Sequence, residues 1–311
     1  MKLKDLLRAP TKEEERAFER ENVLRKREHY LVTNPLERFA GDPAYRAKVE
    51  RIEAALGEPG GRVLDVGGNT AGEATILQQH GYRMVVGDIN EAALDISRER
   101  VGKFGLKQPE FVAFDAHHLP FRDGTFQAVT IIEALHHMVD YGQVLAEVHR
   151  VLAPGGIFYS MEPNALNPIR RAAEVRDRFR GTIEKSFYPG QLRRLVEAAG
   201  FERVEVEAFG IEKPEWKRQE VPGYRRWLFR LHCWLGLRHP GWFGSLAVTA
   251  RKAGSPGDGM PTNGSIHEQL QSPAGARALV FDPVPGCWKE SGGSETFADL
   301  NGIPVLVAKD G

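Results

Sequence analysis

The stretch from Arg62 to Glu73 constrains the fold more than any other part of the chain. It opens with a short apolar run ending in Asp65 and Val66, passes through the small-residue turn Gly67–Gly72, and leads into an amphipathic segment. This order predicts a buried parallel strand, a tight turn and a helix N-terminus. Small residues let a ligand approach the backbone, and free N–H groups at a helix N-terminus attract polar ligand atoms. The turn alone also fits a βαβ unit that binds no nucleoside.

Three further apolar runs end in carboxylates, at Asp88, Asp115 and Glu133. Together with Asp65 they should face the crevice beyond the carboxyl ends of the strands, where open α/β sheets bind ligands. Asp88 follows the turn by about 20 positions, the spacing at which an acidic residue accepts hydrogen bonds from ribose hydroxyls. Strands alternate with helices over residues 62–164, which predicts an α/β fold with a doubly wound, mostly parallel sheet.

These segments resemble the class I S-adenosylmethionine-dependent methyltransferases, in particular the small-molecule group of quinone biosynthesis. The matching segments, in family order and spacing, are Val63–Gly67, Val86–Ile89, Asp115–Phe121, Leu135–His137 and Glu147–Gly156. The resemblance implies a Rossmann-like domain closed by a final antiparallel strand, with S-adenosyl-L-methionine as cofactor. The family turn usually reads Gly-x-Gly-x-Gly, whereas here Asn69 and Ala71 depart from it. Asn69 tolerates a positive φ, and Ala71 is expected to add a methyl group near the cofactor.

The resemblance also implies roles for single residues. Asp88 should take the ribose hydroxyls, Asp115 and Ala116 should meet the adenine, Asp65 should meet the ammonium, and Glu133 should line the sulfonium side. Each acidic residue could instead cap a helix. The expected cofactor-binding residues are Asp65, Gly67, Gly68, Asn69, Asp88, Ile89, Asp115, Ala116, Glu133 and Tyr30.

Methyl transfer from a sulfonium mainly requires alignment, and a base is needed only when the acceptor must lose a proton. His136 and His137 follow the fourth strand beside the expected methyl group, and histidine titrates in the right range for that task. His136, nearer the strand end, is the preferred base, and at least one of the pair should be structural. Glu162 is a further catalytic candidate. The acceptor is expected to be a small molecule, either apolar or natural-product-like, that is methylated on oxygen, nitrogen or carbon.

The chain divides into four parts by composition and pattern. Residues 1–60 are helical and form either a cap over cofactor and substrate or a solvated helical pair beside the sheet. The methyltransferase-like domain spans 61–252, and a Gly/Ser/Pro linker covers 253–262. A small β-rich tail occupies 263–311.

The end of the tail, Asn301–Ala308, resembles the zinc-ribbon proteins that activate some methyltransferases. A zinc site needs four ligands, and only Cys287 stands in the tail, so no metal is expected. A unit this small without metal or disulfide should dock on the main domain or on a second copy of it, which allows self-association.

The segment Lys213–Pro240 is basic and rich in tryptophan. Trp227, Leu231, Trp234 and Leu235 share one face at helical spacing. The favoured interpretation is an amphipathic helix that faces the core and leaves its arginines in solvent. A membrane surface at residues 213–243, or a lid over an apolar substrate, also fits but is not favoured.

Composition excludes several classes of function. The 42 basic and 42 acidic residues balance, which does not suggest a nucleic-acid partner. Two cysteines, no secretory signal and no long apolar run favour the cytoplasm. Two alternatives to a methyltransferase remain: a non-catalytic binding or assembly module that kept the fold, and an enzyme whose sulfonium cofactor carries an extra charge and needs an arginine.

Overall fold

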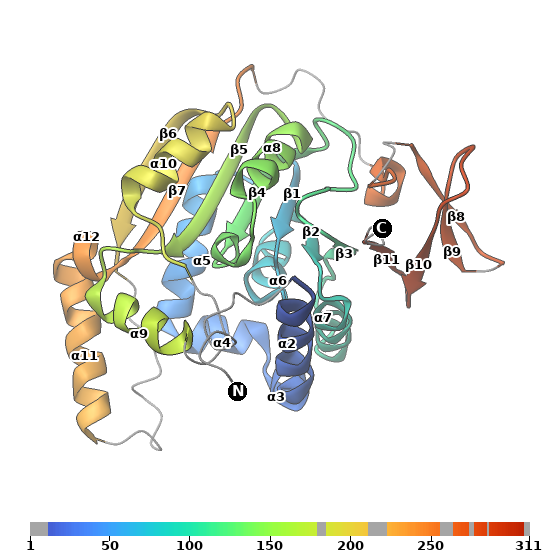
Figure 1. Ribbon diagram of the computed structural model, residues 1–311. Coiled ribbons are helices and arrows are strands. Elements are labelled where there is room, and N and C mark those ends of the chain that lie inside the picture. The colour runs from blue at the N-terminus through green and yellow to red at the C-terminus, as the bar shows by residue number, and fades with distance from the viewer. Residues whose placement is uncertain are drawn as a thin grey trace, which may run out of the picture.

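The computed structural model describes residues 12–178, 185–210, 223–255, 264–273, 277–284 and 286–307. Its centre is one sheet with the strand order β6-β7-β5-β4-β1-β2-β3-β11-β10-β9-β8 (Figure 1). The strands predicted from the sequence are β1 (Arg62–Val66), β2 (Arg83–Asp88), β3 (Glu110–Phe114), β4 (Phe126–Ile132), β5 (Leu152–Pro163), β6 (Glu202–Phe209) and β7 (Ser245–Arg251). β1 to β5 are parallel, and β7 runs antiparallel to both β5 and β6. The predicted doubly wound sheet with a final antiparallel strand is confirmed.

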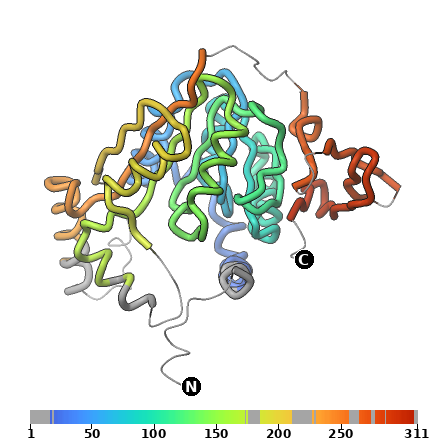
Figure 2. The backbone as a smooth tube through the Cα atoms, turned by 45° about the horizontal axis from the view of Figure 1, so that its top comes forward, coloured from blue at the N-terminus to red at the C-terminus, as the bar shows by residue number. Residues whose placement is uncertain are grey.

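Helices cover both faces of this sheet (Figures 1 and 2). Neighbouring residues of a strand belong to the cores on opposite faces of the sheet, as expected for period-two side chains. Leu64 belongs to the core that includes side chains of α8 and α10, and Val63 belongs to the core that includes side chains of α5 and α6. The helices of the domain are α6 (Gly72–Gln79), α7 (Glu91–Lys103), α8 (Tyr141–Val151) and α10 (Pro189–Ala198). The sheet is therefore buried on both faces, which explains why its strands read as continuous apolar runs.

The N-terminal region is helical, as predicted, and consists of α2 (Lys12–Arg25), α3 (Arg27–Val32), α4 (Pro35–Gly41) and α5 (Pro43–Leu56). The Asp42 side chain caps α5 by accepting hydrogen bonds from the N–H groups of Ala44 and Tyr45. α4 was not predicted, because Asn34-Pro35 reads as a break. In the structure Asn34 caps α4 and Pro35 occupies its first turn, where a missing N–H costs nothing.

The C-terminal tail joins the central sheet. It forms an antiparallel meander of β8 (Leu279–Asp282), β9 (Cys287–Glu290), β10 (Thr296–Leu300) and β11 (Ile303–Leu306). β11 then pairs in parallel with β3, and Ile303 and Leu306 are fully buried. Of the two expected docking modes, the structure shows the tail on its own main domain, where it covers the edge of β3.

Three helices stand at the carboxyl edge of the sheet beside β5, β6 and β7. They are α9 (Pro168–Arg178), α11 (Gly223–Arg238) and α12 (Pro240–Phe243). The predicted apolar face of α11 does not point into the core: Trp227 and Trp234 are 62% and 50% exposed, and Leu231 is also exposed. The core-facing interpretation is therefore wrong, because the helix packs through Cys233 and Gly236 on its opposite side. In the described part of the chain, no helix is both long enough and apolar enough to span a bilayer.

Candidate active site

A cavity of about 730 Å³ lies at the carboxyl ends of the central strands, beneath the N-terminal helices. All ten residues expected to bind the cofactor line it: Tyr30, Asp65, Gly67, Gly68, Asn69, Asp88, Ile89, Asp115, Ala116 and Glu133. They come from α3 and from the ends of β1, β2, β3 and β4. The helical N-terminal region thus borders this cavity, as the cap interpretation requires.

The turn after β1 places its backbone against the cavity. The N–H groups of Gly67 and Gly68 both donate to the carbonyl of Gly87 on β2. Asn69 and Ala71 adopt positive φ values of 45° and 49°, so the glycine-poor turn keeps the left-handed conformation. Ala71 is 1% exposed and packs in the core beside α5 and α6 rather than lining the cavity. The expected methyl group near the cofactor is therefore absent from the cavity wall.

Asp88 and Asp65 show how the strand ends hold their carboxylates. Asp88 accepts hydrogen bonds of 2.8 Å from the N–H groups of Asn69 and Asn90, which fixes it at the mouth of the turn. Asp65 is buried and accepts from Thr130 Oγ1 at 2.8 Å. Burial raises the pKa of Asp65 to about 7, although the Thr130 hydrogen bond opposes the shift. A ligand cation beside it would therefore bind preferentially to the ionised form.

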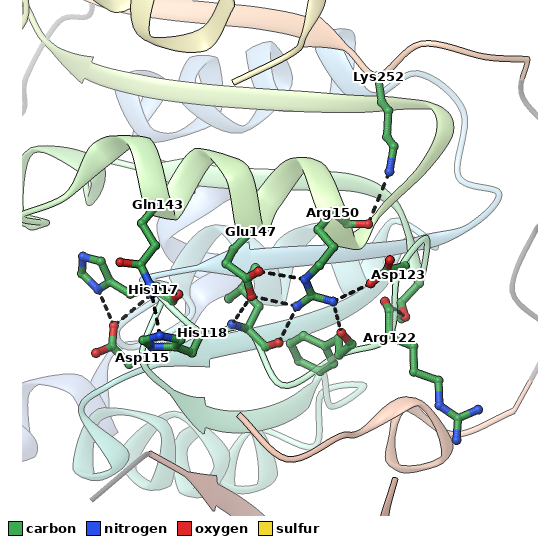
Figure 3. Close-up of polar contacts among 12 residues, drawn as sticks. Asp115, His117, His118, Arg122, Asp123, Gln143, Glu147, Arg150 and Lys252 are labelled. Carbon is green, nitrogen blue, oxygen red and sulfur yellow. Dashed lines mark hydrogen bonds and ion pairs between the residues drawn. The ribbon is translucent and has the colours of Figure 1, made fainter. Parts of the chain in front are cut away.

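Asp115 leads into a loop that His117 stabilises (Figure 3). Asp115 Oδ1 accepts from the backbone N–H of His117 at 2.9 Å and lies 2.5 Å from its Nδ1. Because Nε2 of His117 accepts from the N–H of Asp140, Nδ1 carries the proton and donates to Asp115. His117 therefore orients the carboxylate, and His118 contacts Gln143 on the outer side.

Arg150 ties the same loop to α8. Its guanidinium donates to the carbonyls of Leu119 and Phe121 and to the carboxylates of Asp123 and Glu147. Figure 3 shows the contacts with the two carboxylates. Glu147 in turn accepts from the N–H of Leu119 at 2.8 Å. The motif Glu147–Gly156 thus acts by fastening the loop that follows Asp115 and Ala116.

Replacing Arg150 by Met should lower the free energy of unfolding by about 2–3 kcal/mol, because buried carbonyls and a carboxylate lose their donor. Thermal and urea denaturation would measure the change. Arg122→Met in the same loop is the matched control, since Arg122 is exposed, and should stay close to wild type. Equal stability of the two variants would show that the loop holds without Arg150.

Sequence analysis missed an ion-pair cluster on the cavity wall. Lys48 of α5 lies 2.9 Å from Glu73 Oε1 and 3.0 Å from Glu133 Oε2. Burial alone would lower the pKa of Lys48, but the two carboxylates outweigh it and raise it. Glu133 has a positive φ of 54°, a strained conformation that is frequent at functional sites. A lysine on the buried face of α5, next to Tyr45 and Val49, was the available signal.

The three catalytic candidates do not share one position. Glu162 is fully buried and accepts from the N–H groups of Leu135 and His136, and His136 Nδ1 lies 2.7 Å from its Oε2. The ring of His137 packs on that of His136, with centroids 4.1 Å apart. Among the described residues the cavity lining includes His137 but neither His136 nor Glu162. The position of the cavity therefore favours His137 over His136 as the base.

The environment of His137 keeps it neutral. Its ring is exposed toward the cavity, yet the surrounding protein leaves little water to solvate a charge. This burial, with the charges of His136 and Arg170, holds the pKa of His137 far below its usual value. A neutral imidazole on the cavity wall can accept a hydrogen bond or a proton from a bound molecule.

Several buried polar atoms on the cavity wall fit a polar cofactor. Tyr45 Oη, Asn90 Oδ1 and Arg100 Nε are buried and make no hydrogen bond within the described residues. Such groups are costly unless a ligand or water pairs with them. In the part of the chain that the structure describes, no three His, Cys, Asp or Glu side chains are grouped closely enough to hold a metal ion. Donor and acceptor groups of this kind suit a nucleoside with an amino-acid chain.

The fold and this cavity define a doubly wound α/β protein that binds its ligand across the strand ends. A family model described as a methyltransferase domain matches residues 64–160. The chain is 32% identical over 204 residues to a demethylmenaquinone methyltransferase of Bacillus cereus, covering 58% of this chain and 85% of that protein. It belongs to the class I S-adenosylmethionine-dependent methyltransferases, as the resemblance implied. The resemblance of the tail to zinc-ribbon activators is not supported by these matches.

Other matches are shorter or show the fold alone. A demethylmenaquinone methyltransferase of Clavibacter sepedonicus is 36% identical over 127 residues, which cover 41% of this chain and only half of that relative. A possible histamine N-methyltransferase of Thermotoga maritima superposes with a TM-score of 0.53 at 19% identity, covering 76% of this chain and 98% of that one. The cyclase SpnF also reaches 0.53 at 20% identity, covering 79% and 98%.

Proposed function

We propose that this protein transfers a methyl group from S-adenosylmethionine to a small-molecule acceptor. One observation carries the proposal: the ten residues expected from the sequence to bind the cofactor, from four strand ends and a cap helix, all line one cavity of about 730 Å³. A cavity of this size lies in the range that small ligands occupy. The family membership and the unpaired buried atoms on the wall support the same conclusion.

Different residues of the cavity wall would bind different parts of the cofactor. Asp88 would take the ribose hydroxyls, Asp115 and Ala116 would meet the adenine, and Asp65 would face the ammonium. The turn at Gly67 would lie against the amino-acid chain. The bound cofactor supplies an electrophilic methyl group on a sulfonium, and its leaving group is neutral.

The chemistry expected of the chain itself is orientation, with one proton transfer at most. Glu162 holds the turn Leu135–His137 (η1) through two backbone N–H groups and through His136. This arrangement directs His137 into the cavity. There the neutral imidazole would accept a hydrogen bond from a hydroxyl of the acceptor and take its proton as a weak base, because burial lowers the pKa of His137. Glu162 and His136 are then positioning residues, and His137 is the proposed base.

The acceptor is proposed to be apolar. The relatives named above are demethylmenaquinone methyltransferases, and the acceptor side of the cavity near His137 includes Ile132, Ala134, Met138 and Val139. We therefore propose a hydroxylated aromatic or quinol acceptor. A screen with S-adenosylmethionine carrying a labelled methyl group, and with reduced naphthoquinones of short side chain, would test this class.

Removing Asp88 tests the cofactor site directly. In calorimetric titration with S-adenosylmethionine, Asp88→Ala should bind more weakly by about 1–3 kcal/mol, because the ribose hydroxyls lose their acceptor. Asp95→Ala is the control, since Asp95 lies on α7 outside the cavity lining, and should bind as wild type. Wild-type protein that binds the cofactor but labels no acceptor would favour the non-catalytic module. Failure of the wild type to bind would contradict the proposal.

The pH dependence of cofactor binding tests Asp65. Its pKa is raised to about 7, so the carboxylate that should face the ammonium takes up a proton as the pH falls through 7. The dissociation constant should then rise by up to about tenfold per pH unit between pH 7 and 5. Asp65→Asn should bind weakly with a flat profile. A wild-type profile that is equally flat would place the ammonium elsewhere.

A second candidate cofactor is a sulfonium that carries an additional carboxylate. Arg38 and Arg100 line the cavity, and the guanidinium of Arg38 stacks 4.0 Å from the Tyr45 ring centroid. The arginine that this alternative needs is thus on the wall. Competition between the carboxylated and ordinary sulfoniums, in wild type and in Arg38→Met, would decide between them.

Two further proposals concern the cellular compartment of the protein and its self-association. The sequence contains two cysteines, Cys233 and Cys287, and such sparse cysteine usage supports a reducing compartment such as the cytoplasm. Self-association through the tail is a proposal that β8 supports, because Val280 and Phe281 on this terminal strand of the sheet are exposed.

A further inference from the structure

A set of exposed apolar side chains gathers on α9, α11 and α12. We call it the tryptophan face, and its members are Ile169, Trp227, Leu231, Trp234, Leu237 and Trp242. Trp227, Leu231 and Trp234 follow one another at i, i+4 and i+7, so they form a single stripe along α11. Large apolar side chains gathered on one surface mark an interaction site.

The side of α11 opposite the tryptophan face packs closely against neighbouring backbone. Gly236 of α11 lies against the backbones of Gly210 and Phe243, where a Cβ at Gly210 would stand 2.3 Å from the carbonyl oxygen of Gly236. Asn164 and Asn167, which follow β5, donate to the carbonyls of Gly241 and Phe243 at 2.9 Å. The outward direction of the stripe is therefore fixed by close packing on the other side of the helix.

The charge of this surface is one-sided although the whole chain is neutral. α11 contains four arginines and no acidic residue, and α9 contains four arginines with two acidic residues. The guanidinium of Arg238 lies 5.3 Å from the ring centroid of Trp234, within the stripe itself. A helix face that carries exposed tryptophans with an arginine beside one of them matches an anionic bilayer surface, where tryptophan occupies the headgroup level.

The tryptophan face stands at the same edge of the sheet as the cavity. α9 follows the carboxyl end of β5, and α11 and α12 connect the carboxyl end of β6 to the start of β7, where Pro163 and Phe209 both pair with Ser245. Figure 1 shows these helices and the N-terminal helices that cover the cavity at the same end of the sheet. Arg170 of α9 is close enough to influence the charge state of His137 on the cavity wall.

We propose that the tryptophan face docks on an anionic lipid bilayer, with α11 lying in the plane of the interface. A second copy of the chain is a poorer occupant, because a twofold interface would set two arginine-rich helices that lack acidic residues against each other. Docking would also bring the mouth of the cavity to the layer of the bilayer in which an apolar acceptor dissolves. This consequence rests on the proposed function.

The test is flotation of the purified full chain with vesicles. Vesicles of phosphatidylcholine with about one-third phosphatidylglycerol should bind the protein, vesicles of phosphatidylcholine alone should bind much less, and added salt should weaken binding. The double variant Trp227→Ser with Trp234→Ser should bind at least about tenfold more weakly than the wild type. Arg230→Gln with Arg238→Gln should lose roughly 30-fold in affinity. Leu24→Ser with Val284→Ser, exposed apolar residues far from α11 in sequence, is the control and should bind as wild type.

Three results would overturn the proposal. The wild type could fail to bind anionic vesicles, or the tryptophan variant could bind them as well as the wild type does. Light scattering could also show that the wild type is a dimer and the tryptophan variant a monomer. The last would identify the tryptophan face as an interface between copies. Melting curves of the variants establish that they are folded, which is expected because all four substituted residues of α11 are exposed. The readout needs no cofactor, so it is independent of whether methyl transfer is found.

Discussion

Replacing Gly68 by Ala should weaken binding of S-adenosylmethionine at least about tenfold, the equivalent of roughly 1–3 kcal/mol of overpacking. A Cβ at this position would stand 2.5 Å from Val86 Cγ1 and 2.8 Å from Asp65 Oδ2. Val86 is fully buried in β2 and Asp65 is held by Thr130, so neither can move away cheaply. The turn must shift instead, and the backbone that faces the cofactor shifts with it.

The control for this variant is Gly102→Ala in α7. A Cβ there meets nothing within 4 Å, and an alanine inside a helix favours folding. Calorimetry with the cofactor and melting temperatures of both variants would separate a displaced turn from general unfolding. Wild-type affinity in Gly68→Ala would mean that the turn accepts a side chain at this position, and the close approach of backbone to ligand would then have to be abandoned.

The fold of the central domain was accessible from the sequence because burial on both faces leaves a strong pattern. The runs Val63–Leu64, Met84–Gly87 and Phe111–Phe114 are apolar without interruption, and each is followed at once by an aspartate. The carboxyl end of each strand could therefore be placed to within a residue or two, and with it the cofactor side chains. Strand order alone then brings them together, since parallel strands all end at one edge.

The positions that sequence analysis missed depend on packing between distant segments. Lys48 reads as one more charge on a charged helix, and only the approach of α5 to Glu133 makes it part of the site. The stripe on α11 has the periodicity of a buried face, but periodicity does not say which neighbour covers it. The joining of β11 to β3 is a pairing between strands almost two hundred positions apart in sequence. No local signal specifies such a contact.

The adjacent histidines illustrate the same limit on a smaller scale. Both follow β4, and the sequence favoured His136 because it is nearer the strand end. The structure favours His137 instead, because His136 is paired with the buried carboxylate of Glu162 while His137 lies on the cavity wall. Glu162 lies on β5, so its effect on the turn after β4 appears only when the two strands are paired.

Replacing His137 by Ala should lower the rate of methyl transfer by roughly 10- to 100-fold when the acceptor must lose a proton, at the low end of general-base catalysis because its low pKa makes the imidazole a weak base. The affinity for the cofactor should stay nearly unchanged, because the side chain lies on the acceptor side of the cavity beside Met138. The pKa of His137 is far below its usual value, so the base remains neutral at low pH. The turnover number should therefore show no fall near pH 6.5, whereas cofactor binding falls below pH 7 through Asp65.

Glu162→Gln and His118→Ala complete the experiment. The glutamine variant keeps the shape of the buried side chain but weakens its hold on His136 and the turn, so it should lower turnover less than His137→Ala does and leave the acceptor KM nearly unchanged. His118 is exposed outside the cavity lining, and its variant should match wild type. If His137→Ala retains full turnover, alignment alone drives the reaction and the acceptor arrives already deprotonated. If only His136→Ala loses turnover while its fold and cofactor affinity persist, the proton instead passes through the buried pair of His136 and Glu162.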